Sequence, residues 1–141
     1  MIRLNKLTDY SLNILQFLAI QKESVSAKNI SHANHFPIPV TSKALKLLQK
    51  AALVKSIQGP HGGYILGKKA EKINITEVIE AIENGIYLTD CCKTNKQCNR
   101  KNDCKISQNL QQINQSVITL FDNITIKDLL LKNSSISINT S

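Results

Sequence analysis

A basic amphipathic helix followed at once by a glycine-rich hairpin constrains the fold of this chain more than any other feature. From Pro39 onward the predicted helix has one apolar and one polar face. The apolar face carries Ala44, Leu45, Leu48, Ala51 and Ala52, and the polar face carries Ser42, Lys43, Lys46, Gln49 and Lys50. Residues 53–57 and 64–66 then favour two short strands around a turn at 58–63.

Two earlier helices complete the pattern. Thr8 is a good N-cap for a first helix, whose apolar residues continue to Ala19. Ser26 is placed to cap a second helix, and residues 35–39 favour a turn before the third. Helix, helix, turn, helix and hairpin in this order predict a winged helix-turn-helix, whose third helix enters the major groove of double-stranded DNA.

The distribution of charge agrees with a nucleic-acid partner. The net charge is +8, and all of the excess lies in residues 1–70, where ten Lys and Arg residues stand against Asp9 and Glu23. Residues 71–141 carry eight charges of each sign. A basic half joined to a neutral half indicates a polyanion-binding module beside a sensing or oligomerising module.

The second half of the chain predicts three further helices. Apolar residues at 75–82 form a helical stripe that ends at Asn84 and Gly85. Residues 125–128 resemble a capping box before a short helix. Between them, a narrow stripe fits a long helix that packs either against its copy in a second subunit or back on its own domain. That stripe consists of Leu110, Ile113, Val117 and Leu120.

These elements predict a mainly α chain with a small β-hairpin wing and a long C-terminal dimerisation helix. We expect a winged helix-turn-helix DNA-binding domain over residues 1–70. A cysteine-bearing loop and dimerisation helix are expected over 71–131, followed by a disordered, low-complexity tail over 132–141.

All four cysteines fall in one polar loop, at Cys91, Cys92, Cys98 and Cys104. Lone core cysteines would be scattered along apolar faces, so this clustering indicates a metal or redox site. The sequence contains neither a signal-peptide pattern nor a stretch as long as a membrane span. We therefore expect a cytoplasmic protein without a membrane partner, in which structural disulfides are disfavoured.

The chain resembles the Rrf-two family of bacterial transcription regulators, which includes IscR-like and NsrR-like sensors. The resemblance covers residues 2–131 and is carried by four segments: RLNKLTDYSLNIL, PVTSKALKLLQKAALVKSIQGPHGGYILGK, ITEVIEAIENGI and LTDCC with the two later cysteines. The LTDY segment together with IENGIYLTDCC looks most like the regulator of the SUF iron–sulfur assembly system. The resemblance implies a homodimer on a palindromic operator, with a 2Fe–2S cluster held by Cys92, Cys98 and Cys104.

The fourth cluster ligand is less well defined. The IscR type carries a histidine three residues after the last cysteine, and here Ser107 stands at that position. The nitric-oxide-sensing type can use the aspartate of the LTDY segment from the partner subunit, which implies Asp9 here, with Cys91 as the alternative. Asp9 also suits the first turn of a helix for purely structural reasons.

For DNA contacts, the resemblance implies residues on the third helix and in the wing. These are Thr41, Ser42, Lys43 and Lys46 on the helix, and Gln58, Gly59, His61 and Gly62 in the wing. Some relatives carry an arginine where Gln58 stands, so their operator sequence cannot be transferred. His32 and His35 are interpreted as surface residues.

The function that follows is a repressor of iron–sulfur assembly genes that senses cluster status. One alternative is a nitric-oxide-sensing repressor of the NsrR type, and another is a DNA-binding protein with a structural zinc site. Zinc sites favour shorter, paired cysteine spacings than the five-residue gaps found here. We do not expect an enzyme or a small-molecule substrate, because the chain lacks a C-x-x-C pair and no histidine lies in or beside the cysteine loop.

Overall fold

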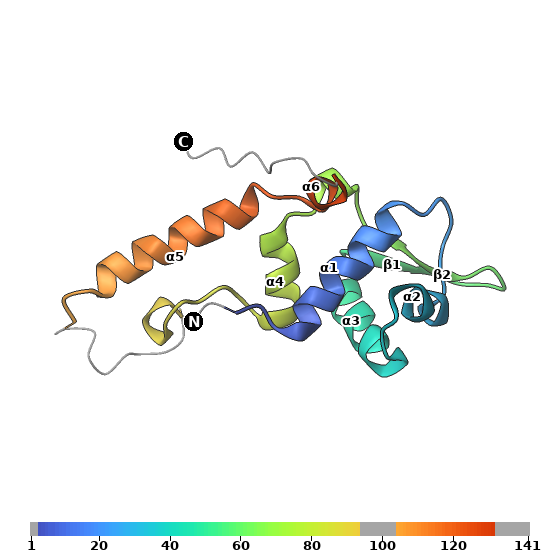
Figure 1. The fold of residues 1–141 in the computed structure, drawn as a ribbon, viewed down its shortest axis with the longest axis horizontal. Helices are drawn as coiled ribbons and strands as arrows, with labels where there is room; N and C mark the ends of the chain where they lie inside the picture. The colour runs from blue at the N-terminus through green and yellow to red at the C-terminus, as the bar shows by residue number, and fades with distance from the viewer. Residues whose placement is uncertain (1–2, 94–103, 132–141) are drawn as a thin grey trace.

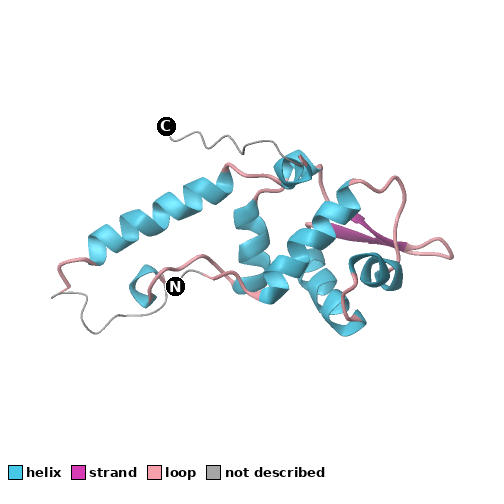
Figure 2. Cartoon of the chain, in the orientation of Figure 1, coloured by secondary structure: helices cyan, strands magenta, loops and turns pink. Residues whose placement is uncertain are grey.

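The computed structural model describes residues 3–93 and 104–131. Its elements, in chain order, are α1 (Lys6–Ala19), α2 (Ala27–Asn34), α3 (Ile38–Lys50), β1 (Val54–Ile57), β2 (Gly63–Leu66), η1 (Ala70–Lys72), α4 (Ile75–Glu83), η2 (Asp90–Cys92), α5 (Ser107–Asp122) and α6 (Ile126–Leu130). Figure 2 shows that helices dominate and that the strands form a single hairpin. The predicted fold class, mainly helical with a β-hairpin wing, is confirmed. The predicted tail over 132–141 lies outside the described residues.

The helix boundaries follow local capping chemistry, with one correction. Ser26 caps α2 as expected, since its side chain accepts a hydrogen bond from the Asn29 amide. The prediction for Thr8 was wrong, because Asn5 is the N-cap and α1 already begins at Lys6. Thr8 is fully buried inside the first turns, where its hydroxyl donates to the Glu83 carboxylate of α4.

The recognition helix α3 begins as the sequence indicates and ends earlier. Pro39 lies in its first turn, where a missing N–H costs nothing. The helix stops at Lys50 because Ala52 adopts a left-handed conformation with φ of 59°. Ala51 and Ala52 are therefore exposed in the following turn, and the apolar face of α3 consists of the buried residues that precede them.

The wing is an antiparallel pair of strands, and its second strand, β2, also hydrogen-bonds to the loop before α2. Val54 pairs with Leu66, and Ile57 pairs with Gly63. On the other edge of β2, Tyr64 forms an isolated bridge with Val25, in the loop between α1 and α2. A Cβ at Gly63 would lie 2.4 Å from the carbonyl carbon of Val25, so this close approach requires glycine.

One hydrophobic core joins both halves of the chain. It includes Ile14, Leu15, Leu18, Ile30, Ala44, Leu45, Leu48, Leu53, Val54, Ile73, Val78 and Ile126. Because the last three belong to the same cluster as the α1 and α3 residues, packing is continuous across residue 70. The predicted division at residue 70 into a DNA-binding part and a cysteine-bearing part therefore stays a prediction about function. In the described residues, no helix is long and apolar enough to cross a membrane.

Helices α4 to α6 connect the core to the outer part of the molecule. Asn74 and Glu77 form a capping box at the start of α4, and Asn84 ends the helix with φ of 59°, as the sequence indicates. The predicted capping box of Thr125 and Asp128 is also present. Figure 1 shows α5 extending away from the body formed by α1 to α3, with α4 between them.

Candidate nucleic-acid interface and metal centre

The exposed face of α3 carries most of the helix residues expected to contact DNA. Lys43 and Lys46 are exposed, and Ser42 is half-buried at the edge of the same face. Thr41 differs, because it is fully buried and its hydroxyl donates to the Pro37 carbonyl at 3.2 Å. Its side chain belongs to the packed face of α3, so the structure gives it no place on the exposed surface.

The tip of the wing is exposed and internally fixed. Gln58, Gly59 and His61 are exposed, and the Gly62 amide donates to the Gly59 carbonyl at 2.9 Å. Gly59 has φ of 115°, a conformation that favours glycine. The Ser24 hydroxyl donates to the His61 carbonyl at 2.7 Å, which anchors the tip to the loop that precedes α2.

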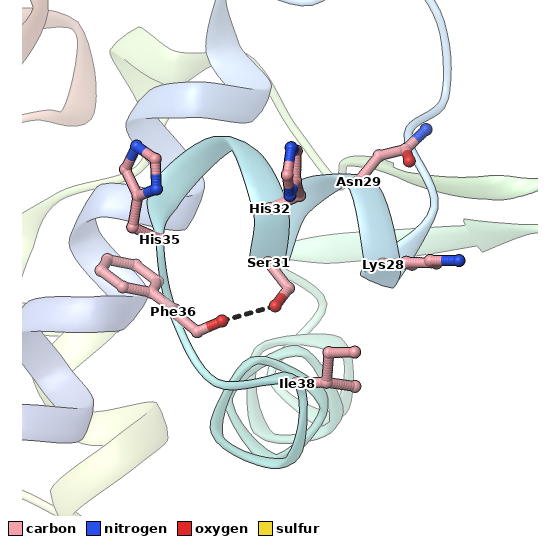
Figure 3. A pocket seen from close by; sticks show the side chains of 7 residues that line it. All are labelled: Lys28, Asn29, Ser31, His32, His35, Phe36 and Ile38. Carbon is pink, nitrogen blue, oxygen red and sulfur yellow. Dashed lines mark hydrogen bonds between the residues drawn. The ribbon is translucent and has the colours of Figure 1, made fainter.

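A groove of about 450 Å³ lies beside the first turn of α3 (Figure 3). Its lining residues are Lys28, Asn29, Ser31, His32, His35, Phe36 and Ile38, none of which is acidic. The Ser31 hydroxyl donates to the Phe36 carbonyl at 2.5 Å and holds the turn between α2 and α3. The groove brings Lys28 of α2 close to the exposed Ile38, the first residue of α3. Neither residue was among the predicted DNA contacts, although their positions at the starts of α2 and α3 were a usable signal.

The cysteine segment lies against α5. Cys91, Cys92 and Cys104 are free and half-buried, while Cys98 lies outside the described residues. The Thr89 hydroxyl lies 2.9 Å from the Cys91 sulfur and 3.3 Å from the Cys92 sulfur. The Cys92 thiol contacts the Leu110 carbonyl at 3.8 Å, in the first turns of α5. Cys104 precedes the same helix by three residues, so described thiols border its N-terminal end from both sides of the loop.

The donor chemistry of this loop fits an iron–sulfur cluster, because free cysteine thiols are the usual cluster ligands. Among the described residues, no group of three or more His, Cys, Asp or Glu side chains is arranged to hold a metal ion. The predicted ligand Cys98 lies outside the residues to which this statement applies. Asp9 is exposed on α1 and accepts a hydrogen bond from the Asn13 amide at 3.3 Å. Ser107 is buried at the start of α5, where its hydroxyl donates to the Cys104 carbonyl.

Comparison with known proteins identifies the family. The family model Rrf2, described as "Iron-dependent Transcriptional regulator", matches residues 4–132. The chain belongs to the Rrf2 family of transcriptional regulators. It is 30% identical over 132 residues to the HTH-type transcriptional regulator NsrR of Shouchella clausii, covering 92% of this chain and 89% of that protein. Family membership confirms a DNA-binding regulator and not an enzyme.

Solved structures support the winged-helix fold of this Rrf2 protein. CymR, the global cysteine regulator of B. subtilis, matches with a TM-score of 0.75 and 25% identity over 92% of this chain and 97% of its own. The T. potens IscR structure matches with a TM-score of 0.70 and 23% identity, covering 92% and 86% of the two chains. At that identity the second likeness concerns the fold alone.

The exposed position of Lys43 leads to a prediction about DNA affinity. If the Lys43 ammonium contacts a phosphate, Lys43→Ala releases one fewer counterion on binding. The slope of log K against log salt concentration should then become shallower by about 1. Fluorescence anisotropy with operator DNA selected from a random pool measures this slope. Lys72→Ala is the matched control, because Lys72 is an exposed lysine of η1, which packs against α6 and α1. A slope unchanged in Lys43→Ala would make Lys43 a surface charge without a DNA contact.

Proposed function

We propose that this Rrf2 regulator is a repressor of iron–sulfur assembly genes that senses a 2Fe–2S cluster held by Cys92, Cys98 and Cys104. The observation that carries the proposal is the placement of free, half-buried thiols against the N-terminal end of α5. Half-burial leaves these sulfurs accessible to a cluster, and the Cys92 thiol contacts α5, which packs against α4. A cluster bound there would supply chemistry that responds to oxidants, nitric oxide and loss of iron.

Packed elements connect this site to the recognition helix. The Thr76 hydroxyl of α4 donates to the Ile118 carbonyl of α5 at 3.4 Å. The opposite side of α4 contributes Val78 to the core that also holds Leu48 of α3. A shift of α5 relative to α4 would therefore change the packing of α3. If the contact between α4 and α5 has two arrangements with different operator affinity, the state of the cysteines can switch DNA binding on or off.

The remaining ligand position is proposed for Asp9 of a second subunit, with Cys91 as the alternative. The Asp9 carboxylate is exposed, and its partner within the chain is the Asn13 amide, so it is accessible to another copy of the chain. Cys91 adjoins Cys92 and shares the Thr89 hydroxyl with it. Ser107 has no basic nitrogen to offer and is already bonded to the Cys104 carbonyl.

The proposed partner is double-stranded DNA with a palindromic operator, bound by a homodimer. The DNA contacts are proposed for the exposed face of α3 and the wing tip, namely Ser42, Lys43, Lys46, Gln58, Gly59, His61 and Gly62. Two copies related by a two-fold axis would present two α3 helices to two half-sites. Thr41 lies on the opposite, buried face of α3 and is not among the proposed contacts.

The α5 helix supports the dimer proposal. The residues of the predicted apolar stripe on this helix do not all face the same way. Leu110 and Val117 line a groove of about 440 Å³ with residues 85–89 of the same chain, whereas Ile113 is 52% exposed. Ile106 and Tyr87 are also large exposed apolar or aromatic residues in this part of the molecule. A second copy of α5 would remove these side chains from water.

A nitric-oxide-sensing repressor is the second candidate, and the curated relatives favour it. Besides the protein of Shouchella clausii, the HTH-type regulator NsrR of Bacillus licheniformis is 31% identical over 95% of this chain. Both candidates use the same cysteines and the same DNA surface. The genomic DNA fragments retained by the purified protein separate them, because the candidates differ in their target genes.

Replacing single cysteines tests the cluster assignment. Cys92→Ala, Cys98→Ala and Cys104→Ala should each abolish the visible absorption of anaerobically purified protein, because each removes a thiolate ligand. Cys91→Ala is the matched control and should retain most of the absorption. Operator affinity measured before and after iron removal should differ in the wild type and in Cys91→Ala, and not in the other three variants. Full visible absorption in Cys98→Ala would contradict the assignment.

A charge placed on the exposed apolar surface of α5 tests the dimer. Ile113→Glu places a carboxylate where a second α5 would pack, so the protein should become monomeric in analytical ultracentrifugation. Affinity for a two-site operator should fall about a hundredfold or more, because bivalent binding is lost. Gln111→Glu, an exposed change on the same helix, should remain dimeric. A dimer that tolerates Ile113→Glu would place the interface elsewhere.

A further inference from the structure

Asn114 is a buried polar residue at a position where the helix pattern calls for an apolar one. It is 6% exposed and lies on the face of α5 that also carries Ser107, Leu110, Val117 and Phe121, spaced by three and four residues. Leu110, Val117 and Phe121 line the groove against α4 and residues 85–89. A buried amide at this position must be hydrogen-bonded, since an unpaired one would be strongly destabilising.

Both ends of the Asn114 amide bind the backbone of the segment that leads to the cysteines. Its Oδ1 accepts from the Leu88 N–H at 2.8 Å, and its Nδ2 donates to the Ile86 carbonyl at 3.1 Å. The carbonyl of residue 86 and the N–H of residue 88 are the pair that one residue of a parallel strand would bind. The Asn114 side chain therefore acts as a one-residue strand partner for this segment.

This clamp sets the register of the cysteines on α5. Leu88 lies three residues before Cys91, and the intervening Thr89 hydroxyl contacts the Cys91 and Cys92 sulfurs. The Cys92 thiol contacts the Leu110 carbonyl, one helical turn before Asn114. The segment thus meets α5 at two points one turn apart. Two points fix the position of the segment along the helix more firmly than the thiol contact would fix it by itself.

We propose that Asn114 is the positioning residue that fixes the cysteine segment on α5 and passes the state of the thiols to the DNA-binding unit. The amide binds the segment on one side, and one turn later the Ile118 carbonyl of the same helix accepts from Thr76 of α4. A change in the cysteine segment therefore shifts α5 and α4 together. The coupling half of this inference rests on the proposed sensing function, and the positioning half does not.

The test uses the full chain with Asn114→Leu, a substitution of similar size that suits the apolar stripe and removes both hydrogen bonds. In metal-free protein, hydrogen exchange of the Leu88 amide should become about tenfold faster, the factor that corresponds to the loss of one hydrogen bond. Asn109→Leu, at an exposed position of the same helix, is the control and should leave this rate unchanged. Asn114→Asp retains an acceptor for the Leu88 N–H, so its exchange should stay slow.

The second readout is the ratio of operator affinities between iron-loaded and metal-free protein. Coupled sites typically show a ratio of about 5–150-fold. Asn114→Leu should bring the ratio at least about fivefold closer to one while iron and sulfide content stay at the wild-type level. In Asn114→Asp the carboxylate cannot donate to the Ile86 carbonyl, so the affinity ratio of this variant should also move closer to one. Because this variant keeps the bond to the Leu88 N–H, that result would separate the coupling from the loss of the Leu88 bond.

The outcomes are distinguishable. Slow Leu88 exchange in Asn114→Leu would overturn the positioning role. A wild-type affinity ratio retained in Asn114→Leu, with fast exchange, would overturn the coupling. A ratio of one in the wild type would overturn the sensing function itself and with it the coupling, and the exchange rates would then decide the positioning role alone.

Discussion

The packing of α4 between the DNA-binding core and α5 is the interaction on which the rest of the structure depends. Val78 shares a buried cluster with Ile14 of α1 and Leu48 of α3, so α4 cannot move without disturbing the recognition helix. Its other side bonds to α5 through Thr76. The half of the chain that carries the excess positive charge and the half that carries the thiols are therefore packed together through α4. A metal-dependent change at the cysteines, as proposed, would reach the recognition helix through this packing.

Glu83 at the end of α4 adds a second junction. Its carboxylate accepts from the backbone N–H of Asn5 at 2.9 Å and from the Thr8 hydroxyl, which fixes the N-terminal turn of α1 to the end of α4. That turn carries Asp9, and the chain leaving Glu83 runs directly to Cys91. The segments that carry the proposed ligands Asp9 and Cys91 are thus joined at Glu83 by hydrogen bonds.

Features that depend on residues close together in sequence were predicted correctly, whereas contacts between residues far apart in sequence were not. The caps at Ser26 and Thr125 and the stop at Asn84 each depend on residues within one turn, and periodicity identified the buried face of α3. Thr8 was misassigned because its partner, Glu83, lies 75 residues away. The clamp made by Asn114 was missed for the same reason, because its partners lie 26 and 28 residues away. Thr41 was missed for a different reason: it was assigned to the DNA surface although it lies in helical register with Ala44 and Leu45 on the buried face of α3. The cysteine spacing pointed to a metal, but the support that α5 gives to Cys92 required the structure.

The most direct test of the account is the visible absorption spectrum of anaerobically purified protein, with iron, sulfide and zinc assayed on the same sample. If thiolates of this loop hold a 2Fe–2S cluster, as proposed, the spectrum shows broad visible bands and the sample contains iron and sulfide in equal amounts. Colourless protein with one zinc per chain would contradict the account, since a closed structural zinc site leaves the loop without a sensing role.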